Sequence, residues 1–149
     1  MPKTIAVLIG LQASGKSTFY KTHLSEQFVR VNLDTLKTRH RERCLIEECH
    51  AKGQSYAVDN TNPTRLDRAR YIAPAKAEGY RVIGYFMESK LRACVERNAK
   101  REGAARVPDQ AIAATSNKLE LPSLEEGFDE LYFVRIDGED MVVDPWRNE

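Results

Sequence analysis

Gly10-Leu11-Gln12-Ala13-Ser14-Gly15-Lys16-Ser17 is the stretch that decides the fold, because it fits the pattern G-x-x-x-x-G-K-[ST] at every fixed position. The apolar, β-branched run of residues 4–9 precedes it, as expected of a strand buried on both faces. Residues 16–27 follow it with apolar side chains at helical spacing. Strand, glycine loop and helix together predict a loop that binds the phosphates of a nucleotide.

The residues of this loop have separate expected roles. Gly10 and Gly15 allow backbone angles closed to other residues, so that successive N–H groups converge on phosphate oxygens. Lys16 is expected to reach the β- and γ-phosphates, and the Ser17 hydroxyl to coordinate Mg²⁺. The nucleotide, ATP or another NTP, is expected to contact Gly10, Gln12, Ala13, Ser14, Gly15, Lys16, Ser17 and Thr18.

Length and composition set the broad class. The 149 residues are expected to form one domain, residues 1–149. With 23 basic and 22 acidic residues, the net charge of +1 gives no global attraction to nucleic acid, so any basic footprint must be local. The three cysteines lack C-x-x-C spacing, which argues against a disulfide framework and a zinc site. Since no apolar stretch approaches membrane-spanning length, we expect a cytoplasmic protein without a membrane partner.

An acidic residue follows the second predicted strand, residues 28–32. Asp34 lies just beyond the end of this strand, where open α/β sheets bind their ligands. Residues 35–52 are expected to form one helix, whose first half is strongly basic. The basic residues fit either a solvated helix face or a local patch for an anionic substrate. They are Lys37, Arg39, Arg41 and Arg43.

A second carboxylate ends the third predicted strand, residues 55–58. Asp59 occupies the usual place of the second Mg²⁺-associated acid in enzymes with such a loop. It is therefore a candidate to contact the metal, directly or through water, or the substrate. The alternative is an acid that only ties the following turn together. In that turn, Asn62 is expected to cap a helix and Pro63 to begin it.

The second half of the chain suggests a lid. Arg97 and Arg101 lie four residues apart and are therefore expected on one helical face. A lid over residues 97–118 would bring both arginines over the transferring phosphate, although surface solvation also explains such a pair. The expected elements here are a strand, a helix, a flexible segment and a short helix, over residues 81–87, about 90–100, 102–108 and 109–118.

The order of elements specifies an α/β class. The fifth predicted strand is residues 131–136, and Asp137-Gly138 resembles a hairpin turn into residues 141–143 at a sheet edge. We expect a three-layer P-loop kinase domain with a mostly parallel five-stranded sheet and a helical lid. Within it, Asp34 is expected to meet the acceptor and not the metal.

Three further segments resemble the kinase domain of polynucleotide kinases, especially animal polynucleotide kinase/phosphatase. The likeness runs from about Leu8 to Phe133 and implies ATP-dependent phosphorylation of a 5′-hydroxyl on DNA or RNA. The segments, V-N-L-D-T-L, V-D-N-T-N-P and P-S-L-E-E-G-F, are residues 31–36, 58–63 and 122–128.

The resemblance implies roles for the residues already singled out. Lys16 and Ser17 match the family's phosphate and magnesium residues, and Asp59 its second essential carboxylate. Asp34 matches the general base, which accepts the hydroxyl proton late in a loose transition state.

The resemblance also implies a lid and an acceptor contact. Arg97 and Arg101 match the family's lid arginines. Lys37, three residues after the base, is expected on the same side of its helix, where it can hold an acceptor phosphate. One position departs from the pattern, because Leu33 stands where the family usually has arginine.

Two other functions stay open at this stage. Related P-loop phosphotransferases with the same base and lid act on small-molecule alcohols. A non-catalytic, regulatory ATP-binding module is the third interpretation, but it would not need an acid at Asp34. The family's phosphatase module has no counterpart in this sequence, so a separate phosphatase or ligase partner is left open, as is the oligomeric state.

Overall fold

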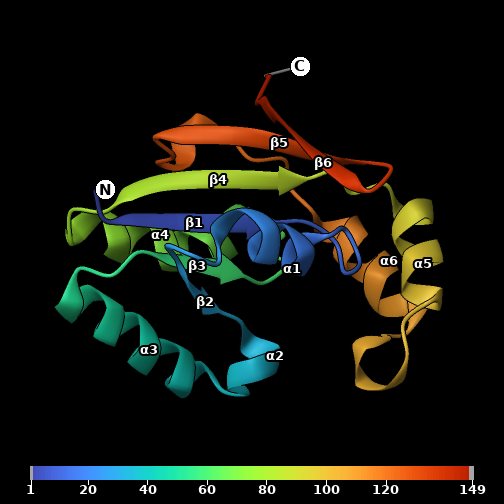
Figure 1. Cartoon of the computed structure of the whole chain (residues 1–149), viewed down its shortest axis with the longest axis horizontal. Helices are drawn as coiled ribbons and strands as arrows, with labels where there is room; N and C mark the ends of the chain where they lie inside the picture. The colour runs from blue at the N-terminus through green and yellow to red at the C-terminus, as the bar shows by residue number, and fades with distance from the viewer. Residues whose placement is uncertain (1, 148–149) are drawn as a thin grey trace.

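A computed structural model describes residues 2–147 and shows a six-stranded sheet in which five strands run parallel (Figure 1). The strand order is β2-β3-β1-β4-β5-β6. All six residues of β1 are buried, because this apolar strand lies inside the sheet with a helical layer on each side. The strands are β1 (Thr4–Ile9), β2 (Val29–Val31), β3 (Tyr56–Asp59), β4 (Arg81–Met87), β5 (Glu130–Asp137) and β6 (Asp140–Pro145).

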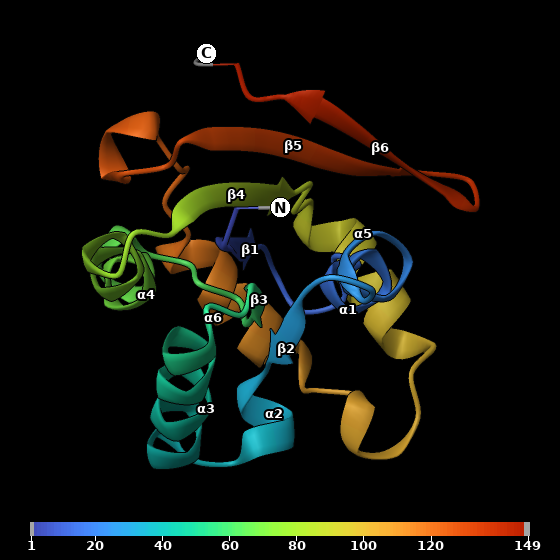
Figure 2. The same cartoon turned by 60° about the vertical axis from the view of Figure 1, so that its left-hand side comes forward.

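Helices cover both faces of the sheet. The helices are α1 (Lys16–Phe19), the π-helix η1 (Tyr20–Leu24), α2 (Leu33–Leu36), α3 (Arg39–Lys52), α4 (Arg65–Ala77), α5 (Leu91–Ala99), the 3₁₀ turn η2 (Gly103–Ala105), α6 (Asp109–Lys118) and the 3₁₀ turn η3 (Leu124–Glu126). Figure 2 shows α4 and α1 on opposite sides of β1. In the part of the chain that the structure describes, no helix is long and apolar enough to cross a membrane.

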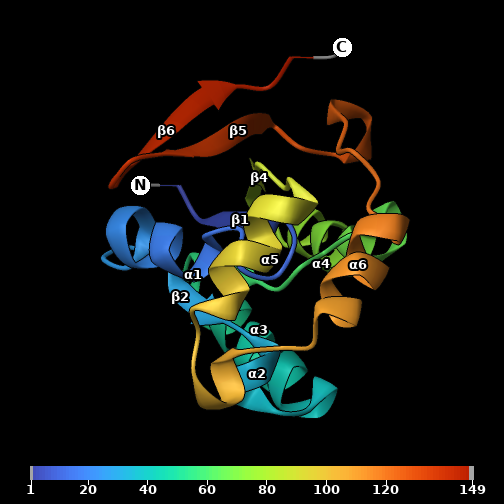
Figure 3. The same cartoon turned by 90° about the vertical axis from the view of Figure 1, so that its right-hand side faces the viewer.

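The core explains the layers. Ile5 and Val7 pack in a cluster with residues of α3 and α4, whereas Ala6 and Leu8 pack in another with Phe19 of α1. Successive side chains of β1 point to opposite faces of the sheet, so each face packs against its own layer of helices. A third cluster joins the glycine loop to α5 and α6, which Figure 3 brings to the front. The predicted three-layer α/β class is confirmed.

The sheet has one strand more than the five predicted. The expected turn at Asp137-Gly138 does form, with Gly138 at φ 64°, and leads into β6 antiparallel to β5. β6 covers residues 140–145, longer than the predicted edge segment of residues 141–143. The hairpin also reaches the glycine loop, because a Cβ on Gly15 would lie 2.9 Å from Met141 Cε.

The helix predicted over residues 35–52 is two helices. Lys37 has φ 76° and ends α2. Thr38 is the N-cap of α3, because its hydroxyl oxygen accepts a hydrogen bond of 3.1 Å from the Arg41 N–H. The prediction that Lys37 shares a helical face with Asp34 is therefore wrong, because Lys37 lies past the end of α2.

The start of α4 also differs from the prediction. Thr64 is the N-cap, since its hydroxyl accepts from the Asp67 N–H at 3.1 Å. Asn62, predicted as the cap, instead donates from its side chain to the Leu8 carbonyl at 2.8 Å. This bond fastens the turn after β3 to β1, so Pro63 precedes the helix without beginning it.

The segment of residues 122–128 is bonded to helix α4. Arg68 of α4 is fully buried and donates through Nε and Nη2 to the two carboxylate oxygens of Glu126, at 2.7 and 3.1 Å. Glu126 also accepts from the Ser123 N–H at 2.9 Å, which completes a capping box around η3. The motif thus joins the stretch after α6 to α4 and contributes to folding.

Candidate active site

The glycine loop turns the chain from β1 into α1. Ala13 and Gly15 adopt left-handed backbone angles, with φ of 64° and 99°. Gly10 is short of space, because a Cβ there would lie 2.7 Å from Ser14 Oγ. From the sequence, glycine is expected at this position because it lets the backbone N–H groups approach a phosphate. In the structure, the neighbouring atoms of the protein also leave no room for a side chain.

Lys16 is buried inside its own loop. Its ammonium group donates to the carbonyl oxygens of Gly10 at 3.0 Å and Leu11 at 2.7 Å. Burial lowers the pKa of Lys16 from 10.5 to about 8, and the Asp59 charge partly opposes this shift. The charges of Arg101 and Asp34 act on the same ammonium group, so the predicted site residues gather around Lys16.

Ser17 and Asp59 meet directly. The Ser17 hydroxyl donates to Asp59 Oδ2 at 3.1 Å, and Thr18 beside it is exposed. The same carboxylate oxygen accepts from Arg30 Nε at 2.8 Å, and Arg30 Nη2 lies 2.8 Å from it in an ion pair. Arg30 Nη2 also donates to Ser17 Oγ at 2.9 Å. A serine, a carboxylate and an arginine thus form one cluster beside the loop.

Arg30 was not predicted as a site residue. It stands in the centre of β2 and pairs with Ala57 of β3, so its side chain lies on the same face of the sheet as that of Asp59, two residues further. The signal in the sequence was a single arginine between two valines, V-R-V, directly before the V-N-L-D-T-L segment.

Asp34 lies on the short helix α2, and its carboxylate is exposed. Two asparagines hold this helix against the end of β3. Asn32 accepts from the Thr35 N–H at 3.1 Å and donates to the Asp59 carbonyl oxygen at 2.5 Å. The side chain of Asn60 accepts from the Leu33 N–H at 3.0 Å. The backbone that carries Asp34 is therefore fixed relative to Asp59.

A buried polar network supports Asn60 from behind. The Asn60 amide donates to Glu42 Oε2 at 3.2 Å, and the Tyr71 hydroxyl lies 3.0 Å from both oxygens of this carboxylate. Arg39 completes the network with bonds of 2.9 Å to Glu42 and 2.7 Å to Tyr71. Burial, together with the Glu42 charge, raises the pKa of Tyr71, so its hydroxyl stays a donor. Arg39 is thus engaged with Glu42 and Tyr71, although it is exposed, as are Lys37, Arg41 and Arg43.

The two predicted lid arginines contact different parts of the site. Arg97 of α5 donates to the Ala13 carbonyl at 2.5 Å and so docks on the glycine loop. Arg101 lies beyond the end of α5 and donates to the Ala105 carbonyl at 3.3 Å. The prediction that they share one helical face is wrong, because the helix ends between them.

The predicted lid of residues 97–118 is fastened at both ends. Asn98 is fully buried and holds the connecting loop through two bonds to the Val107 backbone, of 2.6 and 3.0 Å. Gln12 of the glycine loop donates to Thr115 of α6 at 3.1 Å, while its Oε1 atom is buried without a hydrogen-bond partner in the described residues. Gln12 is therefore a polar link between the loop and α6 that keeps one unused acceptor.

The donor set fits magnesium. Ser17 and Asp59 provide the hard oxygen ligands that Mg²⁺ prefers, and this ion takes its other ligands from phosphate and water. Across residues 2–147, no group of three or more His, Cys, Asp or Glu side chains could hold a metal ion.

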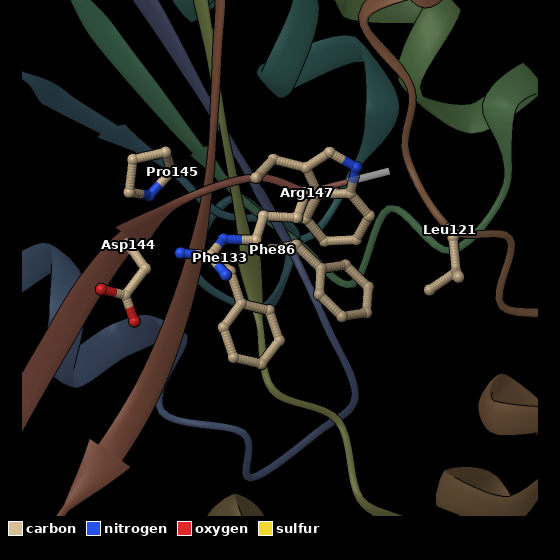
Figure 4. A pocket seen from close by; sticks show the side chains of 7 residues that line it. Phe86, Leu121, Phe133, Asp144, Pro145 and Arg147 are labelled. Atoms are coloured by element: carbon tan, nitrogen blue, oxygen red, sulfur yellow. The ribbon is translucent and has the colours of Figure 1, made fainter. Parts of the chain in front are cut away.

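A hollow of about 540 Å³ lies elsewhere, against the outer strands β5 and β6 (Figure 4). None of the predicted site residues lines it. Its walls are Phe86, Leu121, Phe133, Asp144, Pro145, Trp146 and Arg147. The candidate active site is therefore the cluster around Lys16 and not this hollow.

A comparison with protein families decides the wider class. Residues 5–122 match the family described as AAA domain, from β1 to just past α6. The chain belongs to this family. The matched region of the AAA domain includes the glycine loop, Asp34, Asp59 and both predicted lid arginines.

Two curated proteins are similar to this AAA domain in sequence. A bifunctional polynucleotide phosphatase/kinase of Acanthamoeba polyphaga mimivirus is 34% identical over 138 residues, which are 87% of this chain. The bifunctional polynucleotide phosphatase/kinase of Schizosaccharomyces pombe is 31% identical over 130 residues, 83% of this chain. The chain spans only 32% and 31% of the length of these relatives. The resemblance found in the motifs is confirmed at the level of sequence.

The AAA domain also shares its fold with solved structures. Kti12 of Chaetomium thermophilum, in complex with ADP-AlF3, superposes with a TM-score of 0.65, at 15% identity and with 91% of each chain covered. At this identity the likeness concerns the fold alone.

Proposed function

We propose that this AAA domain is a kinase that transfers the γ-phosphate of ATP, or another NTP, to the 5′-hydroxyl end of DNA or RNA. The proposal rests chiefly on the position of Asp34. Its carboxylate is exposed on an anchored helix, and the charge of this carboxylate acts on the Lys16 ammonium group. The acceptor is supported by the two relatives, which are named for polynucleotide phosphatase and kinase activities.

In this proposal the glycine loop holds the nucleotide phosphates. Lys16 exchanges the carbonyl oxygens of Gly10 and Leu11 for phosphate oxygens, whose charge compensates for its burial. Ser17 and Asp59, directly or through water, hold Mg²⁺, which neutralises charge on the phosphate oxygens when bound.

Asp34 accepts the proton of the attacking 5′-hydroxyl. Its exposed carboxylate forms no hydrogen bond or ion pair within the described residues, so its oxygens are available to an incoming hydroxyl. Asn32 and Asn60 fix the helix that carries it, and such positioning supplies much of the catalysis in phosphoryl transfer.

Arg97 and Arg101 stabilise charge on the transferring phosphate from the other side. We propose residues 97–118 as the lid of a single catalytic domain, with Arg97 already placed on the glycine loop. A guanidinium that leaves a backbone carbonyl for a phosphoryl oxygen gains a stronger, charge-assisted hydrogen bond.

The acceptor phosphates meet the exposed basic residues after α2. Lys37, Arg41 and Arg43 are available for this role, whereas Arg39 is engaged with Glu42. The small net charge favours a footprint of one or a few phosphates. A phosphatase or ligase that acts on the same ends would come from another part of the protein or from a separate partner.

The test is transfer of labelled γ-phosphate from ATP to a panel of 5′-hydroxyl oligonucleotides, nucleosides and small alcohols. We expect transfer to short single-stranded oligonucleotides, inhibited by salt, with little transfer to nucleosides, which lack phosphates. Lys37→Ala should raise the KM for the oligonucleotide, whereas Lys52→Ala, an exposed lysine at the end of α3, should not. Transfer to a small alcohol alone would replace the acceptor and retain the kinase, and nucleotide binding without any transfer would contradict the proposal.

A further inference from the structure

Arg30 occupies the place where the proposed metal ligands converge. Its Nε donates to Asp59 Oδ2 at 2.8 Å, and its Nη2 lies 2.8 Å from the same oxygen in an ion pair and donates to Ser17 Oγ at 2.9 Å. Ser17 in turn donates to the same Oδ2 atom. The oxygen of Asp59 and the hydroxyl of Ser17 are therefore both engaged by one cation from the protein itself.

The burial of Asp59 explains why a cation is needed there. Its side chain is 1% exposed, and a buried carboxylate without a partner is strongly destabilising. Lys16, another nearby cation, donates to backbone carbonyls and forms no ion pair with Asp59. In the nucleotide-free protein the direct counter-charge of Asp59 is thus Arg30.

Arg30 can also leave. Its side chain is 33% exposed, and it extends from β2, which is the outermost strand on this side of the sheet (Figure 2). A long arginine side chain can turn its charged end into water without moving the strand that carries it. Asp59, in contrast, is the last residue of β3 and pairs with Leu8 of the central strand β1, while β2 pairs with β3 as far as Val58.

We infer that Arg30 is a resident counter-cation that holds Ser17 and Asp59 ready in the nucleotide-free protein and competes with Mg²⁺ for their oxygens. Arg30 thereby sets the concentration of Mg²⁺ at which metal–nucleotide binds. The inference rests on the proposed function only in requiring that the chain bind a metal–nucleotide, whatever the acceptor is.

The experiment compares the wild type with Arg30→Gln, Arg30→Lys and a control, Arg81→Gln. Arg81 is a matched arginine, since it pairs with Glu130 at 3.1 Å on another strand, far from the glycine loop. Two quantities are measured: the Mg²⁺ concentration at half-maximal binding of a fluorescent ADP, and the Tm of the nucleotide-free protein in EDTA.

Arg30→Gln should lower the Mg²⁺ midpoint about fivefold to tenfold, the scale of a charge-assisted hydrogen-bonded pair with one partly exposed partner. It should also lower the Tm in EDTA, because Asp59 loses its counter-charge, and added Mg²⁺ should restore the Tm. Arg30→Lys should fall between the wild type and Arg30→Gln, because lysine keeps the charge but loses the two-point contact. Arg81→Gln should leave the midpoint unchanged.

An unchanged or raised Mg²⁺ midpoint in Arg30→Gln, with normal nucleotide binding, overturns this inference and leaves the kinase proposal intact. A lower Tm alone would make Arg30 purely structural and also overturns it. If Arg30→Gln fails to fold, the midpoint of Arg30→Lys decides. Binding of metal–ADP with a shifted midpoint, but without transfer to any oligonucleotide, supports the inference while the proposed acceptor fails.

Discussion

The proposed nucleotide side and the proposed acceptor side of the site are built in opposite ways. On the nucleotide side, Lys16, Ser17 and Asp59 all make hydrogen bonds to other groups of the protein. On the acceptor side, Asp34 and Lys37 are exposed, and only the backbone around Asp34 is held in place.

The difference follows from what each side must do without its ligand. Buried charges that await phosphate and metal need internal partners, since an unpaired buried charge destabilises the fold. A base that awaits a hydroxyl proton needs free oxygen atoms at a fixed position. The nucleotide side is therefore pre-satisfied and must exchange its bonds on binding, whereas the acceptor side is pre-positioned and exposed.

The strongest test of this contrast removes the nucleotide side. Lys16→Ala and Ser17→Ala should each lower phosphoryl transfer by about 10³-fold or more, because they remove charge from the γ-phosphate and a metal ligand. Lys21→Ala, an exposed lysine in η1, is the control and should retain activity. Steady-state transfer rates with saturating Mg²⁺ measure the effect, and full activity in either site variant would contradict the proposed site.

The acceptor side should respond differently. Asp34→Asn should lower kcat by about 10²- to 10⁴-fold, the usual contribution of a general base, while ATP affinity stays near that of the wild type. Glu47→Gln, an exposed carboxylate of α3, is the matched control. Equal losses of ATP binding and turnover would instead make Asp34 a nucleotide or metal residue, and the contrast between the two sides would disappear.

A change behind the acceptor side should have a smaller effect. Asn60→Ala removes the bond to the Leu33 N–H and one donor to the Glu42 carboxylate. Displacement of α2 should lower kcat by about 10- to 10²-fold with little change in ATP affinity. The free energy of unfolding should fall by about 1–3 kcal/mol, because Glu42 loses a buried partner. Turnover and Tm are measured together, and a lower Tm with unchanged kcat would deny Asn60 any positioning role.

Much of the fold could be predicted, because local patterns and tertiary packing agree. The apolar strand before the glycine loop, the strand of residues 81–87 and the helix of residues 109–118 have the predicted bounds. The break between α2 and α3 could not be predicted. Lys37 adopts φ 76° there, although such a backbone angle is usually indicated by glycine or asparagine, and no proline marks the break.

The candidate site was predictable where a motif fixes the chemistry and not where geometry does. The positions of Lys16, Ser17, Asp34 and Asp59 follow from strand ends, which meet at one edge of a parallel sheet. The contact of Arg30 depends on the register of β2 against β3, which the sequence does not reveal.

The pH dependence of nucleotide binding should reflect the burial of Lys16 among its internal partners. Burial lowers the pKa of Lys16 to about 8 in the nucleotide-free protein, and neighbouring phosphate charge should raise it again. Above about pH 8, the free protein has lost this proton and the complex regains it, so binding takes up a proton and weakens as the pH rises. Below that pH, Lys16 is charged in both states and contributes no such dependence.

The same shift has a defined sign for folding. The unfolded chain, with the ordinary lysine pKa of 10.5, binds more protons than the folded one between about pH 8 and 10.5, so the nucleotide-free protein should gain stability as the pH rises across this window.

Calorimetry of nucleotide binding at about pH 9, in two buffers of different ionisation enthalpy, measures the proton uptake on binding, with about pH 7 as the reference. Lys16→Arg keeps its charge throughout and should show no uptake from this position. Equal proton uptake at both pH values in the wild type would mean that the pKa of Lys16 is ordinary. The Lys16 ammonium group would then be far more hydrated than its hydrogen bonds to Gly10 and Leu11 indicate.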